Sequence, residues 1–116
     1  MKRQRAEARG RRGETLAAWW LRLHGWRIVA RRQRIAVGEV DLIARRGGTL
    51  AFIEVKWRTK AADLDTAIDG WRLRRVAAAV QMLAPRLART HENIRIDVML
   101  LAPWRRPRHL TNVWQP

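Results

Sequence analysis

Two adjacent glycines, Gly47 and Gly48, separate two runs of the chain, 37–45 and 49–57, that we read as strands with alternating side chains. A Gly-Gly pair between two such runs is a strong signal for a β-hairpin with a two-residue turn. In that register the numbers of paired residues have a constant sum, so Asp41 lies opposite Glu54 and Glu39 lies opposite Lys56. The hairpin therefore predicts a sheet that carries charged side chains on one face near its end.

The remaining elements follow from the spacing of apolar residues. Helical spacing predicts helices over about 13–24, with Gly25 as its C-cap, and over about 65–87, where Pro85 would kink or end the helix. Further strands are expected at 26–32, 93–101 and 109–114. The order α-β-β-β-α-β-β predicts an α/β fold, a mixed sheet flanked by helices, in one domain over 13–116. Residues 1–12 are expected to form a mobile basic arm.

The charge of the chain is strongly positive. The 25 Lys and Arg residues outnumber the 10 Asp and Glu residues, which gives a net charge of +15. Such a surface favours contact with nucleic acid, DNA more than RNA, and that contact would weaken with salt. An arginine-rich genome composition is the competing explanation. The motifs of P-loop ATPases, dinucleotide enzymes and serine hydrolases do not occur in the sequence.

Cysteine is absent, which excludes disulfides and thiolate metal sites and favours a reducing cytoplasm. No apolar run is long enough to span a bilayer, so membrane insertion is not expected. A secretory signal is not expected either, because no apolar segment precedes a cleavage site.

The predicted hairpin places Asp41 and Glu54 side by side, and like charges in this position destabilise a sheet. A divalent cation resolves the conflict, since hard carboxylate oxygens suit Mg²⁺ or Mn²⁺. Neighbouring arginines could neutralise the pair instead. Lys56 is one of three lysines among the 25 basic residues, and its compact ammonium can orient a water molecule.

The arrangement Asp41…Glu54-Val55-Lys56 resembles the D…ExK core of restriction-endonuclease-like nucleases. A longer match resembles the bacterial YraN family and covers about 13–101. It comprises Gly13-Glu14, Gly25-Trp26, the run 38–44, the run 52–56, Arg58 and Arg95-x-Asp97. The layout is also similar to that of archaeal Holliday junction resolvases.

This resemblance implies a restriction-endonuclease-like fold and a Mg²⁺- or Mn²⁺-dependent endonuclease acting on DNA, including branched or repair intermediates. Asp41, Glu54 and Glu14 would be metal ligands, and Lys56 would orient water. Glu39 would have a supporting role, either by pairing with Lys56 or near the metal. A homodimer in the bacterial cytoplasm is expected by analogy. The chain departs from the family pattern at Arg32, usually Asn, at Arg72, usually Lys, and at Trp57.

Several other residues receive an expected role. Those expected to contact nucleic acid are Arg32, Arg34, Arg58, Lys60, Arg72, Arg75 and Trp57. Most of the seven tryptophans should lie in the core, whereas Trp57 and Trp104 suit stacking on unpaired bases. The three histidines are expected at the surface, and Arg95 and Asp97 are expected to form a structural ion pair.

Two main functions remain open from the sequence. One is a metal-dependent nuclease, and the other is a non-catalytic nucleic-acid-binding protein with a structural acidic hairpin. A basic protein of the membrane surface or of the ribosome is a third, weaker alternative.

Overall fold

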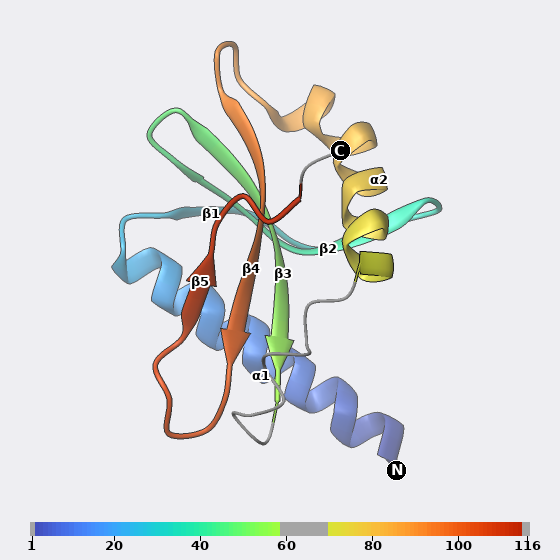
Figure 1. Cartoon of the computed structure of the whole chain (residues 1–116), viewed down its shortest axis with the longest axis vertical. Helices are drawn as coiled ribbons and strands as arrows, with labels where there is room; N and C mark the ends of the chain where they lie inside the picture. Colours follow the sequence, from blue (N-terminus) through green and yellow to red (C-terminus); the bar gives the residue numbers. More distant parts are fainter. Residues whose placement is uncertain (1, 59–69, 115–116) are drawn as a thin grey trace.

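The computed structural model describes the backbone of residues 2–58 and 70–114, and the side chains of 11–58 and 72–114. Two helices and five strands occur in this part of the chain, in the predicted order (Figure 1). The elements are α1 (Lys2–Leu23), β1 (Arg27–Ile35), β2 (Gly38–Arg46), β3 (Thr49–Trp57), α2 (Gly70–Leu87), β4 (Asn93–Leu101) and β5 (Arg108–Leu110).

The five strands form one mixed sheet in the order β1-β2-β3-β4-β5. The β1–β2, β2–β3 and β4–β5 pairs are antiparallel, and β3 and β4 are parallel across the crossover that contains α2. The turn at Gly47 and Gly48 sets the predicted register, because Arg46 pairs with Thr49 and Leu42 pairs with Ile53. Gly47 has a φ of 57°, which a two-residue turn of this kind requires.

The helices pack on opposite faces of the sheet, so the domain has two cores (Figure 1). On one face, small residues of α1 such as Ala17 and Ala18 allow the helix to approach Leu42 and Ile53 of the sheet. On the other face, Leu73 and Val76 of α2 pack with Phe52, which is fully buried. Each face of β3 is therefore covered, as expected for a strand at the centre of a mixed sheet.

Four elements differ from the prediction. The first strand, expected at 26–32, runs from Arg27 to Ile35. The helix expected from residue 13 begins at Lys2, so residues 2–12, expected as an arm, continue α1. Pro85 lies inside α2, which ends at Leu87. The last strand covers only Arg108–Leu110, since its pairing with β4 ends at Val98. Residues 65–69 of the expected second helix lie outside the described residues.

One close contact fixes α2 against the start of β2. A Cβ atom added at Gly38 would lie 1.9 Å from the carbonyl oxygen of Arg75, so this strand position has no room for a side chain. The contact holds the first turns of α2 over the end of the hairpin that carries Glu39 and Asp41. None of the described helices is long and apolar enough to cross a membrane.

Candidate functional site

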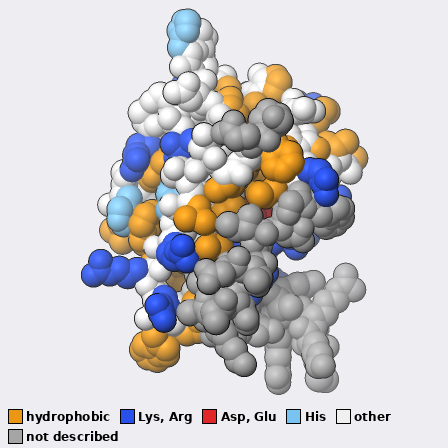
Figure 2. Space-filling view, viewed as in Figure 1, with side chains coloured by type: hydrophobic (Ala, Val, Ile, Leu, Met, Phe, Trp, Pro, Cys, Tyr) orange, Lys and Arg blue, Asp and Glu red, His pale blue; other side chains and the backbone are white. Residues whose placement is uncertain are grey.

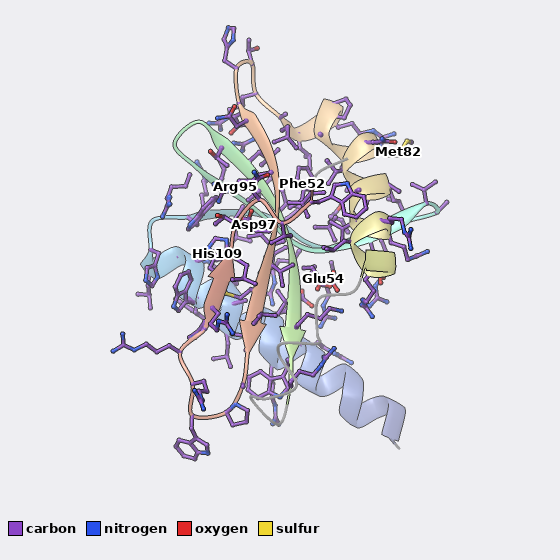
Figure 3. The ribbon with its side chains drawn as sticks, in the orientation of Figure 1. Phe52, Glu54, Met82, Arg95, Asp97 and His109 are labelled. Atoms are coloured by element: carbon purple, nitrogen blue, oxygen red, sulfur yellow. The ribbon has the colours of Figure 1, made fainter. Side chains whose placement is uncertain are left out.

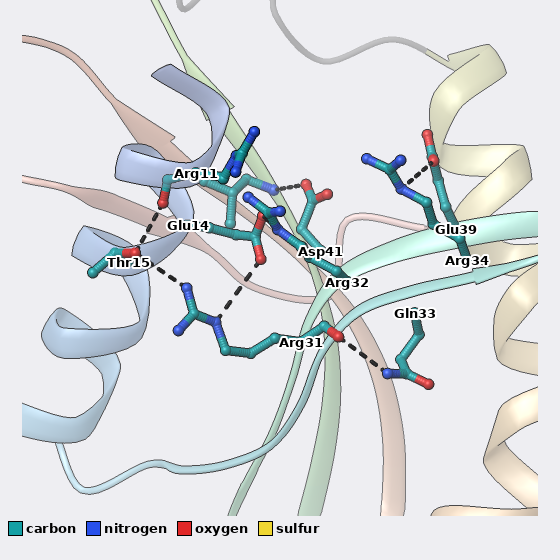
Figure 4. Close-up of polar contacts among 10 residues, drawn as sticks. Arg11, Glu14, Thr15, Arg31, Arg32, Gln33, Arg34, Glu39 and Asp41 are labelled. Atoms are coloured by element: carbon teal, nitrogen blue, oxygen red, sulfur yellow. Dashed lines mark hydrogen bonds and ion pairs between the residues drawn. The ribbon is translucent and has the colours of Figure 1, made fainter. Parts of the chain in front are cut away.

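Acidic side chains from three elements lie near the point where β2 separates from β3. Glu14 comes from α1, Asp41 from β2 and Glu54 from β3. After burial, the charges of Glu54 and of Glu14 raise the pKa of Asp41, so both carboxylates lie near it. The structure therefore brings together the acids that the sequence selected, and Figure 4 shows the Glu14 and Asp41 side of the group.

Asp41 lies at an interruption of β2. Val40 and Ile43 are three residues apart, so regular alternation would place them on opposite faces, yet both pack in the core under α2. The ladder with β3 ends at Leu42 and Ile53, and beyond it the Asp41 carboxylate Oδ2 accepts the backbone N–H of Val55 at 2.7 Å. The expected pairing of Asp41 with Glu54 in the ladder is therefore wrong. The interruption turns Asp41 toward Glu14 (Figure 4).

The carboxyl group of Asp41 has a raised pKa. Burial is the main cause that raises its pKa, the charge of Glu54 is the second, and Glu14 adds to them. The N–H of Val55 and the Lys56 ammonium oppose the rise, and the resulting pKa is about 7. Such a carboxyl is poorly compensated by the protein and favours the arrival of positive charge.

Glu54 is buried and shares one oxygen between two cations. Its Oε1 lies 2.9 Å from Lys56 Nζ and 3.1 Å from Arg72 Nε on α2. Lys56 is itself only 6% exposed, so its ammonium is held inside the protein by the carboxylate. Figure 3 shows Glu54 between β3 and α2. The expected proximity of Glu54 and Lys56 is present, and Arg72 joins them.

Glu14 reaches the site from α1. Only one of its two carboxylate oxygens accepts a hydrogen bond from a described residue. Its Oε2 accepts a hydrogen bond from Arg32 Nε at 2.8 Å. Its buried Oε1 accepts no hydrogen bond within 11–58 and 72–114, and Arg31 Nε lies 3.9 Å away. A buried carboxylate oxygen without a hydrogen bond is costly, so this atom is a candidate ligand for a cation.

The donor set suits the divalent cation that the D…ExK resemblance implies. All donors are hard carboxylate oxygens, one of them lacks a hydrogen bond in the described part, and Asp41 lacks a full counter-charge. In the arrangement observed, cations of the protein hold Glu14 and Glu54. Among the described residues, no three acidic or histidine side chains are grouped closely enough to hold a metal ion as they stand.

Some of the residues expected to contact nucleic acid bind acidic side chains of the protein instead of facing solvent freely. Arg32 and Arg72 bind the acids Glu14 and Glu54. Arg34 lies 3.7 Å from Glu39, which also lies 3.7 Å from Arg72. Thus Glu39 contacts these arginines rather than Lys56, the partner in one of the two roles expected for it.

The others surround the site or lie outside it. Arg58 donates to the carbonyl of Trp57 at 2.8 Å, and Trp57 is half-buried against the core under α1. Arg75 is on α2, where its carbonyl faces Gly38. Lys60 lies outside the described residues.

A second polar cluster centres on Asp97, which is fully buried in β4 (Figure 3). Its carboxylate accepts two hydrogen bonds from Arg95 at 2.9 Å, which confirms the expected ion pair. His109 Nε2 lies 2.7 Å from Asp97, so the prediction that this histidine is at the surface is wrong. Only the pairing of β4 with β5 brings His109 there, and no local sequence signal indicates it.

Known proteins are similar to this chain over most or all of its length. The profile of the uncharacterised protein family UPF0102 matches residues 13–101. A UPF0102 protein of Sphingopyxis alaskensis is 74% identical over the full length of both chains. One from Rhizorhabdus wittichii is 67% identical over 97% of this chain and 96% of its own. One from Caulobacter is 44% identical over 94% of this chain and 79% of its own. The chain therefore belongs to the UPF0102 family, the YraN family that its motifs resemble.

Proposed function

We propose that this protein is a metal-dependent nuclease that hydrolyses phosphodiester bonds of DNA at the site of Glu14, Asp41, Glu54 and Lys56. The observation that carries the proposal is the raised pKa of the partly buried Asp41 carboxyl group. Its pKa is raised to about 7, mainly by burial and then by the charges of Glu54 and Glu14, so its ionised form is costly and a bound cation would relieve that cost. In a chain with a net charge of +15, such a site is unexpected unless a cation uses it.

Asp41, Glu14 and Glu54 would hold a Mg²⁺ or Mn²⁺ ion through their oxygens. Such an ion supplies Lewis-acid chemistry, because it makes water more acidic and polarises the phosphoryl group. Arg72 must release Oε1 of Glu54 for that oxygen to become a ligand. The partly exposed Arg72 side chain has solvent on one side and can make this movement.

Lys56 would act on the attacking water and on the charge that develops at phosphorus. Its ammonium is fixed by Glu54 at 2.9 Å and is buried, so it is oriented before substrate arrives. A preoriented positive charge in a partly dry site stabilises a developing negative charge better than a mobile one. Glu54 thus has two tasks, to position Lys56 and to bind the cation.

The basic surface would hold the DNA backbone. Figure 2 shows Lys and Arg side chains spread between apolar patches on one face of the molecule. Contacts of this kind bind phosphates without regard to sequence and weaken steeply with salt. DNA rather than RNA, and branched rather than plain duplex DNA, are parts of the proposal that rest on the resemblance to junction resolvases.

The alternative is a nucleic-acid-binding protein without catalysis, and one observation favours it. Glu14 and Glu54 each bind an arginine of the chain itself, Arg32 and Arg72, as they would in a purely structural acidic cluster. Both arginines stand where the family usually has a different residue. If they replace a cation permanently, the protein binds DNA but does not cleave it.

Titration calorimetry with Mn²⁺ separates the two functions. The wild type should bind Mn²⁺, Asp41→Asn should lose most of that binding, and Glu92→Gln should keep it. Glu92 is a suitable control because its carboxylate binds Arg45 rather than the site. Equal Mn²⁺ affinity in wild type and Asp41→Asn, or none in either, would reject the metal site and favour the alternative.

A further inference from the structure

An apolar groove of about 400 Å³ lies between α1 and the loop that joins β4 to β5. Its walls include four tryptophans, Trp19 and Trp20 of α1, Trp57 of β3 and Trp104 of the loop. Trp19 is 58% exposed and Trp104 is fully exposed, although large aromatic side chains normally avoid water. Because the core of the domain does not need these two rings, their exposure calls for another explanation.

Positive charge borders the groove. Arg105 is the one charged residue among the described residues that line it, and the guanidinium of Arg22 lies 5.3 Å from the ring centroid of Trp19. Arg106, next to Arg105 in the loop, is exposed as well. Flat aromatic rings with arginines beside them match the two parts of a nucleotide, a base that stacks and a phosphate that carries negative charge.

The groove lies next to the α1 side of the proposed nuclease site, the side that carries Glu14. Trp57 follows Lys56 in β3 and therefore points to the opposite face of the sheet, where its side chain packs with the core under α1, the helix that also carries Glu14. Gly13, which directly precedes Glu14, packs so near Trp57 that an added Cβ would lie 3.6 Å from the Trp57 Cβ. A strand whose phosphate reaches the acids could therefore place a neighbouring base near the tryptophans.

We propose that this groove binds an unpaired base of a single-stranded nucleic acid segment, by stacking on the exposed rings of Trp19 and Trp104. The proposal rests on the proposed nuclease function and names its substrate class, nucleic acid with unpaired bases beside the scissile bond. Bases inside a continuous duplex have no free face for the rings. A second copy of the chain is a less suitable occupant, because each copy carries a net charge of +15 and the two would repel each other.

The test compares two labelled DNA strands of equal length, one of oligo-dT and one in which several bases are replaced by abasic sites. Both carry the same phosphate charge, so their ratio of affinities isolates the contribution of the bases. Fluorescence anisotropy is measured in EDTA, which prevents any cleavage. The wild type should bind oligo-dT about tenfold more tightly than the abasic strand.

Trp104→Ala should lose most of this preference and bind the abasic strand as the wild type does. The side chain of Trp104 is fully exposed, so its removal leaves the fold intact, and Trp104→Phe, which keeps an aromatic face, should retain much of the preference. Met82→Ala, which removes another exposed apolar side chain from α2, should leave the ratio unchanged.

An unchanged ratio in Trp104→Ala, or no preference in the wild type, would overturn the proposal. Sedimentation that shows a dimer abolished by Trp104→Ala, with the ratio unchanged, would assign the groove to a second copy instead. Since the assay contains no metal, it gives a result whether or not the protein is a nuclease. Loss of cleavage and loss of base binding can therefore be distinguished.

Discussion

The carboxylate of Asp41 accepts the backbone N–H of Val55 at 2.7 Å, at the point where the ladder between β2 and β3 ends. The side chain replaces a main-chain partner that the interrupted strand no longer provides. This single contact joins the hairpin geometry to the chemistry, because it fixes a carboxylate between Glu14 of α1 and Glu54 of β3.

Asp41→Asn should stabilise the protein above neutral pH in metal-free buffer. The folded pKa of Asp41 is raised to about 7, mainly by burial, so the native state holds a proton that the unfolded chain releases near pH 4. Protonated Asp41 favours the folded state, so the contribution of this group to the free energy of unfolding is highest below about pH 4. It decreases as the pH rises from about 4 to about 7, by at most about 4 kcal/mol. Asparagine carries no charge and can still accept the N–H of Val55.

Thermal melts of wild type and Asp41→Asn from pH 5 to pH 8 measure this effect. The variant's advantage in melting temperature should grow as the pH rises. A constant difference across this range would show that Asp41 has an ordinary pKa in the folded state.

Arg72→Gln should strengthen Mn²⁺ binding. The Arg72 guanidinium lies 3.1 Å from Glu54 Oε1 and competes with a cation for that oxygen. Its removal leaves Lys56 as the described partner of the carboxylate, so titration calorimetry should report a higher affinity. Arg74→Gln removes the same charge from an exposed position of α2 and is the matched control. Similar gains in both variants would mean that general charge, not Arg72, opposes the metal.

Asp97→Asn should destabilise the fold by about 3 kcal/mol at neutral pH, because it leaves partly buried Arg95 without its counter-charge. Burial alone would raise the pKa of Asp97, but hydrogen bonds from His109 and Arg95 lower it below its usual value. The stability from this group is thus present above about pH 4 and is lost as the pH falls further. Urea unfolding should show that the loss in free energy of unfolding caused by Asp97→Asn becomes smaller toward pH 3.

Glu39→Gln is the control for Asp97→Asn. The Glu39 carboxylate pairs with Arg34 at an exposed position, so the substitution should lower the free energy of unfolding by less than about 1 kcal/mol.

Gly38→Ala should destabilise the protein by about 3 kcal/mol or more, because the new Cβ would meet the Arg75 carbonyl at 1.9 Å and one backbone must move. Gly48→Ala is the matched control, since no atom lies within 4 Å of a Cβ placed there. Chemical denaturation of the two variants compares them directly. Equal stability would contradict the close packing of α2 on β2.

The sequence predicts those parts of the fold that depend on local patterns. The Gly47-Gly48 turn fixes the hairpin register, and β3 and β4 have the predicted bounds, because apolar runs and turn residues mark their ends. Their parallel pairing follows from the helix that connects them. The membership of Glu14, Asp41, Glu54 and Lys56 in one region could also be predicted, since their family resemblance extends along most of the chain.

The remaining features depend on contacts between distant segments. The interruption at Asp41 arises where Val40 turns into the core under α2, which a strict two-residue period cannot show. Arg32 and Arg72 resemble many other arginines in the sequence until the fold places them on Glu14 and Glu54. His109 likewise becomes a partner of Asp97 only through the pairing of β5 with β4.

The most direct test of the account is a cleavage assay with Mg²⁺ or Mn²⁺ on branched, flapped, single-stranded and duplex DNA. It compares the wild type with Lys56→Met, which keeps the buried aliphatic stem, and with Arg86→Met, which removes one exposed positive charge elsewhere. We predict metal-dependent cleavage by wild type and Arg86→Met, and none by Lys56→Met despite nearly unchanged DNA binding. Equal cleavage by Lys56→Met, or no cleavage of any substrate by the wild type, would contradict the account.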